Sequence, residues 1–164
     1  MLVDIKTLGE SSKVWIYQAD RALSRTELDE FTEFLDKSVN NWEAHGAPLK
    51  GGYQLLKNRF LVLVVDEGMN AASGCSIDAS TRWLKHWGDN KGINFFDRSI
   101  FIENEEGELN SYSLNELKSG VEEGRIQEDN FVYTPTVANY AQYLNGWPEK
   151  VGESWMKRYF KAKV

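Results

Sequence analysis

One short segment near the middle of the chain places chemically useful side chains next to a strongly apolar run. The run, Phe60 to Val65, is continuous and rich in β-branched residues, which is typical of a strand buried on both faces. Asp66 and Glu67 end it, and the glycine-bounded stretch 68–74 is typical of a loop. A cysteine and two serines then stand where the pattern predicts the start of a helix. This order predicts that polar groups collect beside a rigid core.

Cys75 is the candidate nucleophile of this segment. A thiol near a helix N-terminus experiences the partial positive charge of unpaired amides, which lowers its pKa and favours the reactive thiolate. His45 could act as the base, and Asp66 or Asp78 could orient it, which would make the protein a cysteine-dependent enzyme or a redox-sensing thiol protein. The structural alternative is a small buried residue in a tight turn. Whether the protein is an enzyme stays open at this point.

A second hypothesis uses the backbone of the same segment. Serine hydroxyls and amides at the start of a helix could bind an anion, with an arginine further along the chain as the countercharge. The structural alternative is that Ser76 caps its own helix and that Gly74 accommodates the backbone of a tight turn. The predicted ligand-binding residues are Asp66, Glu67, Ser73, Gly74, Ser76 and Arg98.

Metal and nucleotide chemistry are disfavoured by spacing. The carboxylates at 66, 67, 78 and 97 could join His45 in an oxygen-rich metal site, but their spacing matches no metal-binding motif. A phosphate loop of the form Gly-x-x-x-x-Gly-Lys-Ser/Thr is also absent from the sequence. We therefore predict no metal and no cofactor, and we consider ATP hydrolysis disfavoured.

Composition narrows the class of partner. The 164 residues carry a formal net charge of −6, which disfavours a general attraction to nucleic acid. A single cysteine cannot form an internal disulfide, and no stretch is apolar enough for a signal peptide or a membrane span, so we expect a cytoplasmic protein without membrane insertion. Six tryptophans exceed the needs of a modest core, so a protein partner or a homodimer is possible. The leading prediction is a small-ligand, anion-binding or protein-interaction module with its site at the 66–78 turn.

Periodicity predicts one α+β domain over residues 1–164. A strand at 14–18 precedes a capping box, Ser24 with Glu27, that opens an amphipathic helix reaching about Trp42. A tight hairpin turn is expected at Lys57-Asn58, and a second helix is expected to reach about Trp87. With a further strand within 93–103, the order is strand, helix, strand, strand, helix, strand. That order predicts a mixed or antiparallel sheet with helices on one face, and it is the order of a ferredoxin-like core, here at about 13–104, extended by a hairpin and helices at about 105–164.

Several stretches show a resemblance that spans nearly the whole chain. At NWEAHGAPLK, FLVLVVDE, ASGCSIDAS and FFDR the sequence resembles a small bacterial family of about this length, which has the motifs NWxAHGxPL and ASGCSID. Its members often carry the automatic name "ABC transporter ATPase", which the missing phosphate loop does not support. The resemblance implies no established activity or catalytic residue. Separately, SLNELKSGVEEGRIQEDNFVY is weakly similar to the helix-turn-strand portion of GYF-type peptide-binding modules, although the GYF tripeptide is absent.

Overall fold

The computed structural model describes residues 1–68 and 74–160, and within this part the chain forms two compact units. Unit 1 consists of Met1–Asp97 and Pro135–Gln142, and unit 2 consists of Arg98–Thr134 and Tyr143–Val164. The fold class is α+β, as predicted. The expected boundary near residue 104 lies within unit 2, in the turn after its first strand. Whether the chain folds as a single domain stays a prediction.

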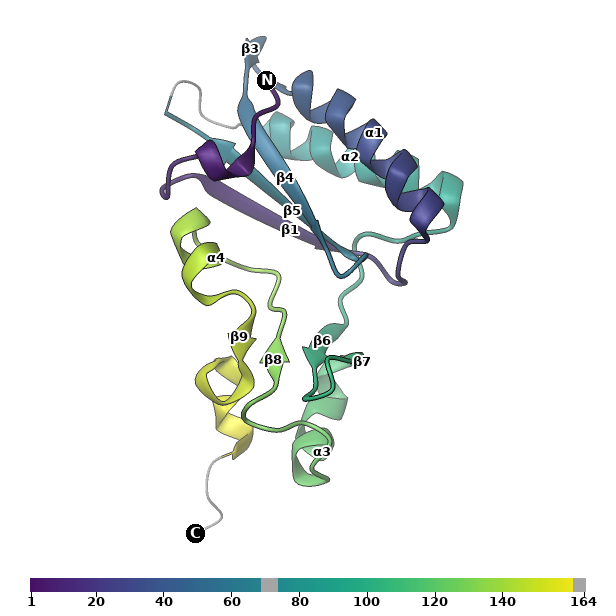
Figure 1. Cartoon of the computed structure of the whole chain (residues 1–164), viewed down its shortest axis with the longest axis vertical. Coiled ribbons are helices and arrows are strands. Elements are labelled where there is room, and N and C mark those ends of the chain that lie inside the picture. Colours follow the sequence, from purple (N-terminus) through teal and green to yellow (C-terminus); the bar gives the residue numbers. More distant parts are fainter. Residues whose placement is uncertain (69–73, 161–164) are drawn as a thin grey trace. The chain divides into compact units, whose positions relative to one another are not determined.

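Unit 1 is a three-stranded antiparallel sheet with two long helices on one face (Figure 1). The order of the strands is β1-β5-β4, and β2 and β3 form a separate two-residue hairpin. In chain order the elements are η1 (Ile5–Thr7), β1 (Lys13–Gln18), α1 (Arg25–Asn40), β2 (Glu43–Ala44), β3 (Ala47–Pro48), β4 (Lys50–Leu56), β5 (Phe60–Asp66) and α2 (Gly74–Lys91).

The core of unit 1 follows from alternation along the strands and from the apolar stripes of the helices. Because residues two apart in a strand share a face, Leu61, Leu63 and Val65 all point to the helical layer. The apolar stripe of α1 packs against these strand residues. Its Phe31 stacks on Phe95, with ring centroids 4.9 Å apart. All six residues from Phe60 to Val65 are fully buried, so the predicted two-sided burial of this strand is confirmed.

The N-terminus of α1 has the predicted capping box. The backbone N–H of Glu27 donates to the Ser24 hydroxyl at 3.2 Å, and the backbone N–H of Ser24 donates to the Glu27 carboxylate at 2.9 Å. Arg21 adds two hydrogen bonds to the same carboxylate, at 2.9 and 2.8 Å. These bonds hold the pKa of Glu27 at about 2, mainly through Arg21 and then through the Ser24 amide.

The ferredoxin-like core is not confirmed. The order β1-β5-β4 is that of the expected split unit, but a fourth strand would have to lie beside β1. The segment 93–96 meets β1 through a single bridge, between Gln18 and Phe96, and the next strand joins unit 2 instead. The free side of β1 is therefore an edge of this sheet.

Unit 2 is built from shorter elements around an antiparallel sheet of order β7-β6-β8-β9. Its core gathers Ile102, Leu117, Val132 and Met156. The helix-turn-strand order of 113–133 is present: a helix, a turn with Gly124 at φ +77°, and a strand. In chain order the elements are β6 (Ile100–Glu103), β7 (Leu109–Tyr112), η2 (Leu114–Glu116), α3 (Leu117–Glu122), β8 (Phe131–Val132), α4 (Tyr140–Gly146, which begins in unit 1), β9 (Glu149–Lys150), η3 (Val151–Glu153) and η4 (Trp155–Phe160).

Candidate functional site

The two carboxylates that end β5 serve the local structure. Asp66 accepts a hydrogen bond from the backbone N–H of Gly68 at 2.8 Å, which closes a turn of the type that aspartate favours. Glu67 lies 3.4 Å from the ammonium group of Lys13 on the adjoining strand. The predicted acidic pair is therefore placed at the strand end as expected, with each carboxylate bonded to its own surroundings.

Ser76 is buried at the start of α2 and fastens that helix to the segment that follows α1, at Trp42 and Glu43. Its hydroxyl donates to the carbonyl oxygen of Glu43 at 2.9 Å, and its carbonyl oxygen accepts from the indole N–H of Trp42 at 2.9 Å. Because both groups are used within the protein, Ser76 acts here as a structural clamp. Gly74 and Asp78 flank it in the same helix and are exposed.

Of the other predicted site residues, some lie away from the 66–78 turn and some fall outside the described part of the chain. His45 is exposed in the β2–β3 turn at φ +52°, and Arg98 is exposed at the start of unit 2, so it belongs to a different unit from the 66–78 turn. Ser73 and the side chain of Cys75 lie outside the described residues, so the nucleophile hypothesis stays a prediction. Among residues 1–68 and 74–160, no cluster of three or more His, Cys, Asp or Glu is arranged to hold a metal ion.

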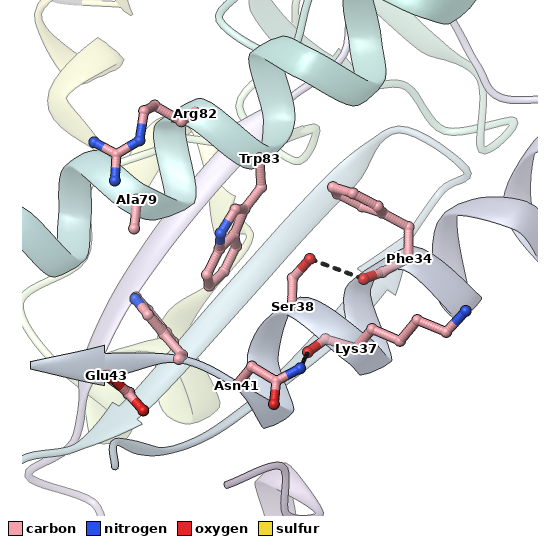
Figure 2. Close-up of a pocket in the computed structure, with 9 residues that line it drawn as sticks. Phe34, Lys37, Ser38, Asn41, Glu43, Ala79, Arg82 and Trp83 are labelled. Atoms are coloured by element: carbon pink, nitrogen blue, oxygen red, sulfur yellow. Dashed lines mark hydrogen bonds between the residues drawn. The ribbon is translucent and has the colours of Figure 1, made fainter. Parts of the chain in front are cut away.

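A groove of about 530 Å³ lies between α1 and α2, next to the Ser76 clamp. Figure 2 shows Trp83 reaching from α2 into this space, with Phe34 and Ser38 on the helix opposite. The groove shares Trp42 and Glu43 with the clamp, so it adjoins the predicted site without including the acidic pair. It is lined by Phe34, Lys37, Ser38, Asn41, Trp42, Glu43, Ala79, Arg82 and Trp83.

Aromatic rings form the walls of the groove, and the core holds them in place. Trp42 is 2% exposed and meets Trp83 edge to face, with ring centroids 5.2 Å apart. Phe34 packs against Trp87, with ring centroids 6.5 Å apart. Trp83 and Phe34 are each partly buried, so part of each side chain contacts the core while part remains accessible.

Most polar groups of the groove are already bonded within the protein. The hydroxyl of Ser38 donates to the carbonyl oxygen of Phe34, and the amide of Asn41 donates to that of Lys37, each at 2.9 Å. Lys37 also lies 3.1 Å from the exposed carboxylate of Glu33. Arg82 differs from them, since within the described part of the chain its guanidinium has no hydrogen bond or ion pair.

The acidic member of the lining, Glu43, is near a further positive charge. The α-amino group of Met1 donates to the carbonyl oxygen of Leu49 at 2.7 Å, and burial lowers its pKa while the charge of Glu43 opposes that shift. Among its described lining residues the groove has two cationic side chains, Lys37 and Arg82, and one carboxylate, Glu43, whereas the whole chain has a formal net charge of −6. The described lining is therefore more basic than the chain as a whole.

Sequence reasoning missed this groove because its walls stand beside the apolar stripes used to predict the helices. In α1 the stripe is Phe31, Leu35 and Val39, and Phe34 lies at its flank. The available signal was an aromatic residue next to each stripe, Phe34 in one helix and Trp83 in the other. Nothing in the local pattern says that these two flanks face each other.

Comparison of the chain with models of known families, with curated proteins and with solved structures found no match. Separately, none of the described helices is both long enough and apolar enough to cross a bilayer.

Proposed function

We propose that the protein is a binding module that holds a small anionic ligand with a flat apolar part in the groove between α1 and α2. The observation that carries this proposal is that the groove lining includes both Arg82, a guanidinium without a partner within the described part of the chain, and Trp83, a partly buried aromatic side chain. The anion-binding function expected from the sequence is kept, and its site moves from the 66–78 turn to the adjoining groove.

The dimensions and chemistry of the groove suit such a ligand. A volume of about 530 Å³ falls within the range of small-molecule sites. Aromatic side chains such as Trp83 and Phe34 stack on flat apolar groups. A guanidinium presents a fork of donors that matches a carboxylate, sulfonate or phosphate, and charge-assisted bonds of this kind are about twice as strong as neutral ones.

A catalytic role has no comparable support among the described lining residues of the groove. A nucleophile needs a base within hydrogen-bond reach, and the Ser38 hydroxyl donates to its own helix instead. Glu43 is the carboxylate of the lining, and the groove has neither histidine nor cysteine among its described lining residues. Binding is therefore the function that these contacts support best.

The test uses two fluorescent probes that differ in one group. Anilinonaphthalene sulfonate is a flat aromatic anion, and N-phenyl-1-naphthylamine is the same molecule without the sulfonate. Arg82→Gln is expected to weaken binding of the anionic probe about tenfold, equivalent to ~1.4 kcal/mol, and to leave the neutral probe within about twofold. Trp83→Ala is expected to weaken both probes, because it removes the stacking surface.

A matched variant and a positional readout complete the experiment. Lys85→Gln removes a charge from the same helix at a side chain 71% exposed that pairs with Asp89, and it should leave both affinities unchanged. The indole N–H resonance of Trp83 should shift on titration with the anionic probe. Equal affinity of the wild type and the Arg82→Gln protein for the anionic probe would contradict the proposal.

A further inference from the structure

The free edge of the unit 1 sheet is a second feature of interest, and it does not involve the groove. In the order β1-β5-β4, strand β1 pairs with β5 on one side, and among residues 1–68 and 74–160 no strand pairs with its other side. A sheet edge presents backbone N–H and C=O groups that can pair with another strand. The question is which groups β1 presents and what covers them.

The direction of each backbone group follows from the hydrogen bonds at the end of the strand. The N–H of Ala19 donates to Arg59 next to β5 at 2.9 Å, whereas the N–H of Gln18 donates away from β5, to Phe95, at 3.2 Å. Because the side to which backbone groups point alternates along an antiparallel strand, Trp15 and Tyr17 bond to β5. The N–H and C=O groups of Val14 and Ile16 therefore point outward from the sheet.

The protein's own chain closes this edge at both ends and leaves its middle open. The carbonyl oxygen of Ser12 accepts a hydrogen bond from the N–H of Tyr140 at 2.9 Å, and the N–H of Gln18 is bonded to Phe95. Between these points, no described residue hydrogen-bonds to the outward backbone groups of Val14 and Ile16. A hollow of about 330 Å³ lies there, lined by 14–17 on β1 and by 135–137.

The exposed stretch is held rigid by the core behind it. The side chains of Val14 and Ile16 are buried, each 8% exposed, so their backbone groups are fixed in direction. Tyr17 is fixed on the opposite face by a hydrogen bond between its hydroxyl and that of Ser80, 3.0 Å apart. A strand added here would meet two donors and two acceptors already in ladder geometry.

We propose that this edge binds a short extended segment of a partner polypeptide as a fourth strand of the sheet. Strand addition of this kind takes its affinity from main-chain hydrogen bonds and its selectivity from alternate side chains, here through contacts with the partly exposed Trp15, Tyr17 and Val137. From Ser12 to Gln18 the edge spans about 20 Å at roughly 3.3 Å per residue, which suits about five residues of a visiting strand.

The occupant is an isolated strand instead of a second copy of the protein. Both ends of the slot are bounded by hydrogen-bonded main chain, at Tyr140 and at Phe95. A second copy would bring its own versions of these two segments to the same edge, where they would compete for the space. A bare peptide carries nothing beyond its own backbone and side chains, so it fits between the boundaries.

Amide hydrogen exchange followed by NMR tests the proposal residue by residue. In the free protein, the amides of Val14 and Ile16 should exchange rapidly, and those of Trp15 and Tyr17 slowly, because the latter pair bonds to β5. Addition of about 1 mM of the end-blocked peptide Thr-Val-Thr-Val-Thr-Val should slow exchange at Val14 and Ile16 by about tenfold or more. The same peptide N-methylated at every residue cannot donate and should give no protection.

A backbone variant provides the matched control in the protein. Ile16→Pro removes one outward N–H, at a position where an edge strand tolerates proline, and should abolish protection of Val14 by the peptide. The dispersion of the other amide resonances reports whether this variant is folded. If this variant is unfolded, the exchange measurements on the wild-type protein with the two peptides decide the question.

Three results would overturn the proposal. One is slow exchange at Val14 and Ile16 in the free protein at all concentrations, since the edge would then be closed. The second is unchanged exchange at these amides with the unmodified peptide present. The third is protection without peptide that rises with protein concentration, which would assign the edge to a second copy of the chain.

Discussion

In unit 1 the core lies between a sheet and two long helices, whereas in unit 2 it lies among short strands, short helices and turns. Unit 1 buries a stack of large rings, Phe31 with Trp87 and Phe95, over strands that run for six or seven residues. Unit 2 also buries aromatic rings, with the ring centroid of Trp147 5.1 Å from that of Tyr133, but its core residues come from short elements and turns, such as Val151 in η3 and Ile126 in the turn after α3. The two units thus differ in the length of the elements that build them, and this difference also affects the surface features that each unit exposes.

The long elements of unit 1 leave features that a ligand can use. Flanks of α1 and α2 line the aromatic groove between the two helices. Strand β1, whose outer side pairs with no described strand, forms the sheet edge at which we propose that a peptide binds. In unit 2 the hollow at Asn104 and Arg125 is smaller, about 170 Å³, and is lined mainly by polar turn residues. We therefore expect binding to concentrate in unit 1, and three stability predictions test how far the units differ.

The largest effect is expected from emptying the ring stack of unit 1. Phe31 is fully buried and its ring lies 4.5 Å from that of Trp87, so Phe31→Ala should lower the free energy of unfolding by about 3–5 kcal/mol. Leu117→Ala in unit 2 should cost about 2–5 kcal/mol, since it is equally buried but smaller. Urea unfolding followed by tryptophan fluorescence measures both.

The same pair of variants tests whether the units unfold together. The segment 135–142 belongs to unit 1 but interrupts unit 2 in sequence, so we expect one cooperative transition that either variant shifts to lower urea. Hydrogen exchange in Leu117→Ala gives the independent check. Loss of protection confined to unit 2 would show that the units are separately stable domains.

Substitution of one glycine in each unit by alanine is expected to change stability by an intermediate amount, and the two changes should differ. A Cβ at Gly88 in α2 would lie 2.3 Å from the carbonyl oxygen of Ile93, a backbone atom that cannot easily move. Gly88→Ala should therefore destabilise by about 1–3 kcal/mol, despite the better helix propensity of alanine. At Gly120 in α3 the nearest atom is the terminal methyl of Ile126, at 2.7 Å, which can shift.

Gly120→Ala serves as the matched comparison for that prediction. The gain in helix propensity, about 1 kcal/mol, should offset most of the crowding, so the net change should stay within about 1 kcal/mol. Thermal denaturation of both variants measures the difference. Equal destabilisation by the two substitutions would contradict the backbone-clash explanation.

The smallest effect concerns one carboxylate and its pH dependence. The pKa of Glu27 is lowered from near 4.5 to about 2, so its bonds to Arg21 and Ser24 stabilise the folded state above pH 4.5. That contribution is lost as the pH falls from about 4.5 to about 2. Glu27→Gln should cost about 1 kcal/mol at pH 7 and much less at pH 2, measured by urea unfolding.

An exposed ion pair in unit 2 provides the control for Glu27. Glu123 lies 2.9 Å from Arg125, but both side chains are about half exposed. Glu123→Gln should change stability by less than about 0.5 kcal/mol. A pH-independent effect of Glu27→Gln would mean that packing of the side chain, and not its charge, matters at the helix start.

Some elements could be predicted from the sequence because their signals are local. The capping box at Ser24 and Glu27, and the Lys57-Asn58 turn, in which both residues have positive φ, depend on neighbours within a few positions. The second helix was predicted to end at about Trp87 but continues to Lys91, and Gly92, at φ +69°, follows it. A glycine directly after Trp87 is typical of a helix end, but Gly88 continues the helix and packs closely against Ile93, a contact that no local pattern reveals.

The sequence by itself determined the long strands and helices of unit 1 and the buried face of each, because apolar spacing within a segment decides how it meets a core. The tertiary structure alone decided that Phe34 and Trp83 face each other across a groove and that β1 has no fourth strand beside it. These outcomes depend on how elements pack against one another, and residues far apart in the chain settle them jointly. No spacing within a single element carries that information.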